Sequence, residues 1–201
     1  PPRDKGEQIS AALKLDPDNA LALEEQAHAE RRPPQKLALA RALTARRPTA
    51  VGYRLLAQAL GRKAEQRPAR IAALEQAVAL DAALVPALVD LSDALRVDGQ
   101  RDRALELSTR AAELAPYDPR AAWSNAESLA KLNRCPEAVA AGRRALELLG
   151  HGSKGLARVL TARVKGWEQG CSEQRAPQDD HRDGEVDDQP GDVDDRGDEG
   201  R

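Results

Sequence analysis

Apolar residues recur along most of the chain at steps of three and four, a spacing that places their side chains on one face of an α-helix. One clear stretch covers 103–115, with apolar residues at Ala104, Leu107, Ala111 and Leu114. The same steps return further on at Ala138, Ala141, Ala145 and Leu148. A second spaced set lies upstream of each: Leu88, Leu91 and Leu95, and then Ala122, Ala126 and Leu129. The pattern predicts pairs of helices whose connections contain Gly99 and Asn133, residues that tolerate a left-handed backbone at a helix C-terminus.

The helical pairs repeat with a period of 34 residues. Shifting the sequence by this length superposes three alanines and three leucines, namely Ala77, Ala111 and Ala145, and Leu80, Leu114 and Leu148. A fixed period of this kind indicates a unit that cannot bury its apolar face alone and must stack on its neighbours. The sequence therefore predicts an array of helical hairpins that share one continuous core.

These residues resemble the tetratricopeptide repeat (TPR), a helix-turn-helix unit of the same length. The copy 85–118 carries small residues and a proline where the family has them, at Ser92, Ala104, Ala111 and Pro116. The copy 119–152 matches with Ala126, Ala138 and Ala145, and has Gly150 in place of the proline. A third copy, 50–84, carries Arg70 in place of the first repeat alanine and Ala82 in place of the proline. The resemblance implies an all-α fold, a right-handed α-solenoid of stacked helix-turn-helix repeats.

Repeats and end segments divide the chain. The array is predicted to occupy 1–170, and it comprises a partial repeat 1–19, repeats 20–49, 50–84, 85–118 and 119–152, and a cap helix 153–168. Repeat 20–49 is shortened, and we expect Pro33 and Pro34 in its inter-helix turn. Leu156, Leu160 and Val164, at steps of four, indicate the cap helix that such an array needs at its end.

Composition supports the helical array and separates it from the C-terminus. The chain contains 38 Ala, 26 Leu and no Phe, which argues against β-rich folds. Ser108 and Gly142 fill the usually aromatic position of the repeat, so we expect loose packing there. From Ser172 to Arg201 there are 12 acidic residues against 4 Arg, with three apolar residues, whereas 27 basic and 21 acidic residues precede this segment. We therefore expect a disordered acidic tail over 171–201 after a basic body.

The resemblance also implies a binding surface, because the first helices of TPR arrays line the concave face. Carried over to this chain, the positions that face the groove are Arg54, Gln58, Arg62, Val89, Asp93, Arg96, Arg120, Trp123, Glu127 and Lys131. Their basic excess suits an extended or helical acidic peptide. Trp123 is the candidate hot spot, although a register shift of one residue would bury it between helices. The family's carboxylate clamp for chaperone C-termini is not matched, so no chaperone partner is implied.

The predicted function is a non-catalytic scaffold or adaptor that binds a partner peptide in the concave groove. One alternative is an accessory TPR domain of a larger enzyme, since the chain begins at Pro1 and has no Met. A second alternative is nucleic-acid binding by the basic body, with Tyr53, Tyr117, Trp123 and Trp167 for stacking on bases. No basic run supports it, so we expect no specific nucleic-acid partner. The excess of Arg over Lys, 24 to 7, resembles proteins of GC-rich bacteria.

Catalytic and cofactor chemistry has little support in the sequence. We find no phosphate-binding glycine loop, no nucleophile elbow and no paired carboxylates in a helical context, so we expect no enzyme activity and no cofactor. His28, His151 and His181 are isolated from one another and from the cysteines, which argues against a metal site. No run of 18 apolar residues occurs, so we expect no membrane insertion.

Cys135 and Cys171 are the two cysteines. We expect Cys135 in the turn between the helices of the last repeat and Cys171 after the cap helix, which returns to the same end of the stack. A disulfide between them would pin the cap helix. The alternative is two unrelated thiols, the usual state in a reducing cytoplasm. The compartment stays open: cytoplasmic with free thiols, secreted or periplasmic with the disulfide.

Overall fold

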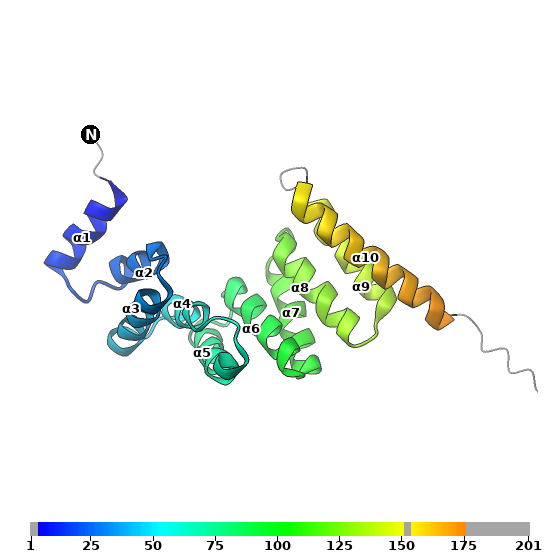
Figure 1. The fold of residues 1–201 in the computed structure, drawn as a ribbon, viewed down its shortest axis with the longest axis horizontal. Coiled ribbons are helices and arrows are strands. Elements are labelled where there is room, and N and C mark those ends of the chain that lie inside the picture. Colours follow the sequence, from blue (N-terminus) through cyan, green and yellow to red (C-terminus); the bar gives the residue numbers. More distant parts are fainter. Residues whose placement is uncertain (1–3, 151–153, 176–201) are drawn as a thin grey trace, which may run out of the picture.

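The computed structural model describes residues 4–150 and 154–175, and within these ranges every regular element is a helix (Figure 1). The α-helices are α1 (Lys5–Leu15), α2 (Ala20–Ala29), α3 (Pro33–Arg46), α4 (Ala50–Leu60), α5 (Arg67–Leu80), α6 (Val85–Asp98), α7 (Arg101–Leu114), α8 (Pro119–Lys131), α9 (Cys135–Leu149) and α10 (Lys154–Arg175). A 3-10 helix, η1 (Ala64–Gln66), precedes α5. The all-α prediction is confirmed.

The helices stack as hairpins along an elongated array (Figure 1). α2 pairs with α3, α4 with α5, α6 with α7 and α8 with α9, and the second helix of each pair packs on the first helix of the next. First helices also pack on first helices, α2 on α4, α4 on α6 and α6 on α8. They therefore form one wall of the array. α1 packs on α2 at one end of the array, where we predicted a partial repeat, and α10 packs on α9 at the other end, where we predicted the cap.

Small residues allow the hairpins to approach closely. Ala77, Ala111 and Ala145, which are one period apart, are all 0% exposed. The corresponding position in α3 is Leu43, which is also 0% exposed, and Gly52 of α4 makes room for it. A Cβ at Gly52 would lie 3.1 Å from Cδ2 of Leu43. The bulk missing from one helix is thus supplied by the helix packed against it, which keeps the core continuous.

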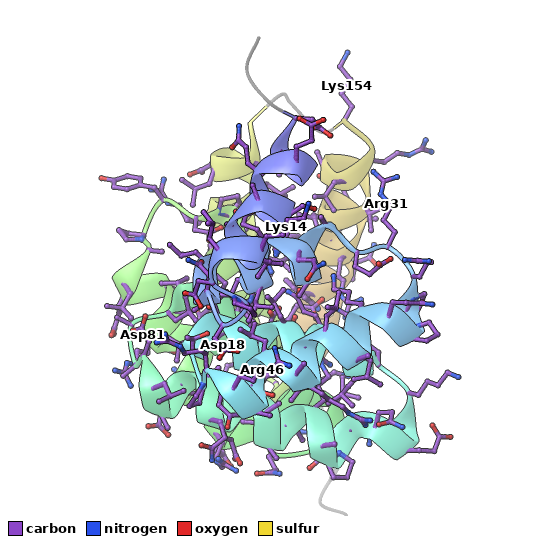
Figure 2. The ribbon with its side chains drawn as sticks, turned by 90° about the vertical axis from the view of Figure 1, so that its left-hand side faces the viewer. Lys14, Asp18, Arg31, Arg46, Asp81 and Lys154 are labelled. Carbon is purple, nitrogen blue, oxygen red and sulfur yellow. The ribbon has the colours of Figure 1, made fainter. Side chains whose placement is uncertain are left out.

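The turns follow local rules of helix capping. Gly99 and Asn133 adopt positive φ angles of 90° and 58°, as their types led us to expect. The side chains of three residues accept hydrogen bonds from backbone N–H groups at helix starts: Asn19, Thr49 and Asp118. At the α1 end of the stack, Nη1 of Arg46 lies 3.5 Å from Oδ1 of Asp18 (Figure 2). Both side chains of this ion pair are more than half exposed, so it adds little stability.

The start of α3 and the end of α10 differ from the sequence prediction. Pro33 and Pro34 are the first two residues of α3 and not part of the turn, because proline lacks the N–H that the first helical turn leaves unpaired in any case. α10 runs to Arg175, seven residues past the predicted end of the cap. Cys171–Arg175 therefore continue a helix where we expected disorder, since Ser, Glu, Gln and Arg are compatible with helix propagation. The rest of the predicted tail, 176–201, lies outside the described residues.

The expected loose packing at Gly142 is wrong. A Cβ at this position would lie 2.7 Å from Cγ2 of Val164 and 3.0 Å from Cζ3 of Trp167. The missing side chain therefore lets α10 lie directly against α9. Ser108, the corresponding residue of α7, is 0% exposed and donates its hydroxyl to the carbonyl of Leu105 at 3.0 Å. Close approach of α10 explains Gly142, and Ser108 is fully buried, so neither position is loosely packed.

Candidate protein-binding groove

A groove of about 360 Å³ lies between α6, α8 and α10. Its charged lining residues are Arg62, Asp93, Arg96, Arg120 and Glu127. Its apolar lining residues are Val89, Trp123, Leu149, Leu156 and Leu160, and Pro119 and Ser124 complete the wall. Clefts of this volume with an apolar lining and a few placed charges are typical of ligand sites.

A buried ion-pair network ties the walls of the groove together. Nη2 of Arg96 lies 2.8 Å from Oδ1 of Asp93, one turn away on α6, and Nη1 lies 2.5 Å from Oε2 of Glu127 on α8. The other carboxylate oxygen of Glu127 lies 2.8 Å from Nε of Arg163 on α10. The side chains of Arg96 and Glu127 are 12% and 10% exposed, so their attraction is weakly screened. The network sets the spacing of three helices.

Trp123 and Trp167 form the aromatic contact between α8 and α10. Their ring centroids are 5.3 Å apart with 26° between the planes, a stacked arrangement. Trp123 is partly exposed, lines the groove and stacks on Trp167 of the cap helix. α10 thus stands beside α8 in the place that the first helix of a further repeat would take.

Similar solved structures share this architecture. TTC0263, a thermophilic TPR protein of Thermus thermophilus, matches over 80% of this chain and 87% of its own with a TM-score of 0.62 and 23% identity. MamA matches over 70% of this chain and 84% of its own, with a TM-score of 0.58 and 24% identity. YrrB, a TPR protein with an unusual peptide-binding site, matches over 77% of this chain and 80% of its own, with a TM-score of 0.58 and 17% identity. The chain is a TPR-like α-solenoid. No protein-family profile matches the sequence, and no curated protein matches it.

The TPR-like stack brings together most, but not all, of the residues predicted for the groove. Seven of them line it: Arg62, Val89, Asp93, Arg96, Arg120, Trp123 and Glu127. Val89 is only 4% exposed and belongs to the core between α6, α7 and α8, so it forms the floor. Arg54 is held by Asp90 at 2.7 Å, which leaves its guanidinium committed to that carboxylate. Gln58 and Lys131 are exposed and do not line this groove.

Sequence reasoning missed the contribution of the cap helix to this TPR-like groove. Leu156 is 48% exposed and Leu160 is 9% exposed, and both line the groove, as does Leu149 at the end of α9. The apolar residues at steps of four pointed to a helix that packs on α9. They carried a second signal, because a cap that packs as a first helix must also present side chains to the concave face. The groove is therefore shorter and more apolar than the repeats alone implied.

The part of the TPR-like stack that the structure describes shows neither a metal site nor a membrane-spanning helix. No group of three or more His, Cys, Asp or Glu residues with metal-binding geometry occurs among residues 4–150 and 154–175. No helix in these ranges is long and apolar enough to cross a membrane. These findings concern the described residues, and the expected absence of a cofactor stays a prediction.

Both cysteines lie in helices of the cap region. Cys135 is the first residue of α9 and Cys171 falls within α10, so neither occupies the turn or the post-helix position that we expected. The side chain of Cys171 lies outside the described residues, and the disulfide stays a prediction.

The register of α9 against α10 supports that prediction. Gly142 faces Val164, and Cys135 and Cys171 each lie seven residues further towards the shared end of the antiparallel pair. We expect intact mass spectrometry of the non-reduced protein after thiol alkylation to show no added label, and two labels after reduction. A disulfide should also stabilise the fold by about 4 kcal/mol in the chain-entropy estimate. Two labels without reduction, in protein taken from its native compartment, would rule the bond out.

Proposed function

We propose that the protein is a non-catalytic adaptor that holds a peptide segment of a protein partner in the groove between α6, α8 and α10. The observation that carries the proposal is the combination of an exposed apolar wall with charged side chains opposite it. Leu156 is 48% exposed on the α10 side. Arg62 and Arg120 are exposed on the other sides. An apolar peptide side chain would bury against Leu156 and Trp123, and charged groups would fix its direction.

The TPR-like fold supports a protein ligand. First helices packed on one another form a continuous wall. Solenoids of this kind bind extended or helical segments through such a surface. YrrB, a neighbour in fold, is a TPR protein with a peptide-binding site. The ion pairs of Arg96 and Glu127 hold the wall in place before a ligand arrives, which reduces the entropy lost on binding.

Panning a random peptide library over the immobilised full-length protein tests the proposal. We expect peptides with an apolar anchor to be enriched, and their affinity to fall about tenfold or more in Leu156→Lys, because a charged group would then occupy the apolar wall. Val159→Lys is the matched control. Val159 is 62% exposed on the same helix but does not line the groove, so its replacement should leave the affinity unchanged. Isothermal titration of one enriched peptide measures all three affinities.

Two results contradict this proposal. The first is a library from which no peptide is enriched above the level of an unrelated helical protein. The second is a set of peptides that bind wild type and Leu156→Lys equally well.

The nucleic-acid alternative loses support from the placement of the aromatic side chains. Trp123 and Trp167 stack on each other, and Tyr53 packs against the core between α4, α5 and α6. Of the four aromatic residues, this leaves Tyr117, whose side chain is 78% exposed, as the one available to stack on a base. Filter binding of single-stranded oligonucleotides across a salt series separates the two functions, since electrostatic binding weakens steeply with salt. The accessory-domain alternative agrees equally well with the groove, because a domain within a larger enzyme would bind peptides in the same way.

A further inference from the structure

A second, smaller pocket lies beside the groove because α4 is one turn shorter than the corresponding helix of the next repeat. α4 ends at Leu60, and the residue one period later is Ala94, yet α6 continues to Asp98. Gly61 ends α4 with a φ of 77°, and the chain needs six residues to reach α5. The missing turn leaves a pocket of about 70 Å³ between the end of α4, the start of α5 and the second half of α6.

Arg70, which lines this pocket, occupies a position that is alanine in the next two repeats. The residues one and two periods later are Ala104 and Ala138, which are both 0% exposed at the crossing of their hairpins. Arg70 replaces that alanine and is itself partly buried. Burial and, after it, the neighbouring positive charge of Arg62 lower the pKa of the Arg70 guanidinium, against smaller opposing effects of Asp90 and Asp93, whose carboxylates are paired with Arg54 and Arg96. A cation placed where the repeat has a methyl group costs stability unless a negative charge meets it.

The charges around the pocket are unbalanced. Five cationic side chains line it: Arg62, Lys63, Arg67, Arg70 and Arg96. Arg96 is neutralised by its carboxylates, and Arg67 lies 3.8 Å from Asp98. No carboxylate of the described residues lies within 4.0 Å of a side-chain nitrogen of the other three, and Asp93 at the pocket wall already pairs with Arg96. Three positive charges therefore face a space large enough for one small anionic group.

We propose that this pocket binds the side-chain carboxylate of an acidic residue in the peptide held by the groove. The inference deepens the proposed function and rests on it. Arg62, Asp93 and Arg96 line both the pocket and the groove, so a peptide anchored against Leu156 can extend one acidic residue into the pocket. A carboxylate there gains charge-assisted hydrogen bonds from guanidinium groups in a partly desolvated site. It also relieves the repulsion between Arg70 and Arg62.

An acetylated, amidated tetraglutamate peptide is the probe for the pocket, with tetraglutamine as the neutral counterpart. We expect tetraglutamate at low salt to shift the arginine Nε–H signals of Arg62 and Arg70 in the NMR spectrum of the labelled full-length protein, and tetraglutamine to leave them in place. Arg70→Ala and Arg70→Gln should each weaken tetraglutamate binding about fivefold, near the upper limit for one partly exposed ion pair. Arg110→Ala removes the same charge from an exposed site on α7 and should change the affinity less than twofold.

The stability of the free protein gives an independent readout. Arg70→Ala restores the small residue of the other repeats and removes a cation that repels Arg62, so its melting temperature without ligand should rise above that of the wild type. A purely structural Arg70 predicts the reverse: a lower melting temperature in Arg70→Ala and unchanged tetraglutamate affinity in Arg70→Gln. That result would overturn the proposal that the pocket binds a carboxylate.

The two proposals fail in different experiments. Peptides that lose affinity in Leu156→Lys but not in Arg70→Gln would keep the groove and overturn the anion pocket. Tetraglutamate binding that depends on Arg70, in a protein that enriches no peptide from a library, would overturn the groove function while the pocket still binds a carboxylate. Equal binding of tetraglutamate by wild type, Arg70→Gln and Arg110→Ala would show non-specific attraction to the basic body and overturn the pocket.

Discussion

Glu127→Ala is expected to lower the free energy of unfolding by about 3 kcal/mol at neutral pH, the range measured when one partner of a buried ion pair is removed. The side chains of Glu127 and Arg96 are 10% and 12% exposed. Water therefore reaches the Arg96 guanidinium poorly and cannot replace the hydrogen bond and negative charge of the lost carboxylate. Nε of Arg96 is already buried without a hydrogen-bond partner. Losing Glu127 would leave Nη1 in the same condition, and only Asp93 would still balance the charge. The large effect therefore comes from the stranded guanidinium.

Urea unfolding followed by circular dichroism measures this loss. Glu137→Ala is the control, because Glu137 forms an ion pair with Arg134 in which both side chains are about half exposed, and its removal should cost less than about 1 kcal/mol. The double variant Arg96→Met with Glu127→Leu removes both charges and should regain most of the stability. A loss in Glu127→Ala no larger than in Glu137→Ala would mean that Arg96 finds water or another acceptor.

The regular hairpins were predictable because their spacing repeats a local rule. Ala104, Ala111, Ala138 and Ala145 lie at fixed steps, and each is 0% exposed in the structure. Gly99 was readable in the same way, since a helix that ends in a left-handed residue favours glycine. Such signals need no knowledge of any distant part of the chain. The fold over α6 to α9 follows from them.

The cap and the groove depended on contacts between segments that no local rule connects. Gly142 looks like a weak point in α9 until Val164 and Trp167 arrive from α10. Trp123 could be assigned either to the groove or to the hairpin interior, and its stacking partner lies outside every repeat. Arg70 was visible as a departure from the repeat, but the pocket beside it depends on the length of α4. Residues that depart from the repeat pattern thus lie where contacts with distant segments, and not the local spacing, determine the structure.

Gly142→Leu is expected to separate α10 from α9 and to cost about 2 kcal/mol of stability. Overpacking a close interface costs up to about 3 kcal/mol, and leucine regains about 1 kcal/mol over glycine in helix propensity. The new side chain would collide with Val164, whose branched β-carbon restricts its movement, and with the ring of Trp167. Gly166→Leu is the matched control, since a Cβ at Gly166 meets nothing within 4 Å and the same substitution should stabilise α10.

The two tryptophans report the separation directly, because the chain contains no others. Stacked Trp123 and Trp167 should give a coupled near-ultraviolet circular dichroism signal that disappears in Gly142→Leu and persists in Gly166→Leu. Undocking α10 also removes Leu156 and Leu160 from the groove, so peptides selected on the wild type should lose affinity in Gly142→Leu, although the substitution lies outside the groove lining. A variant with the stacking signal intact and unchanged stability would show that α10 shifts without leaving α9. Stability and binding would then be independent at this end of the array, contrary to the geometry of α8, α9 and α10.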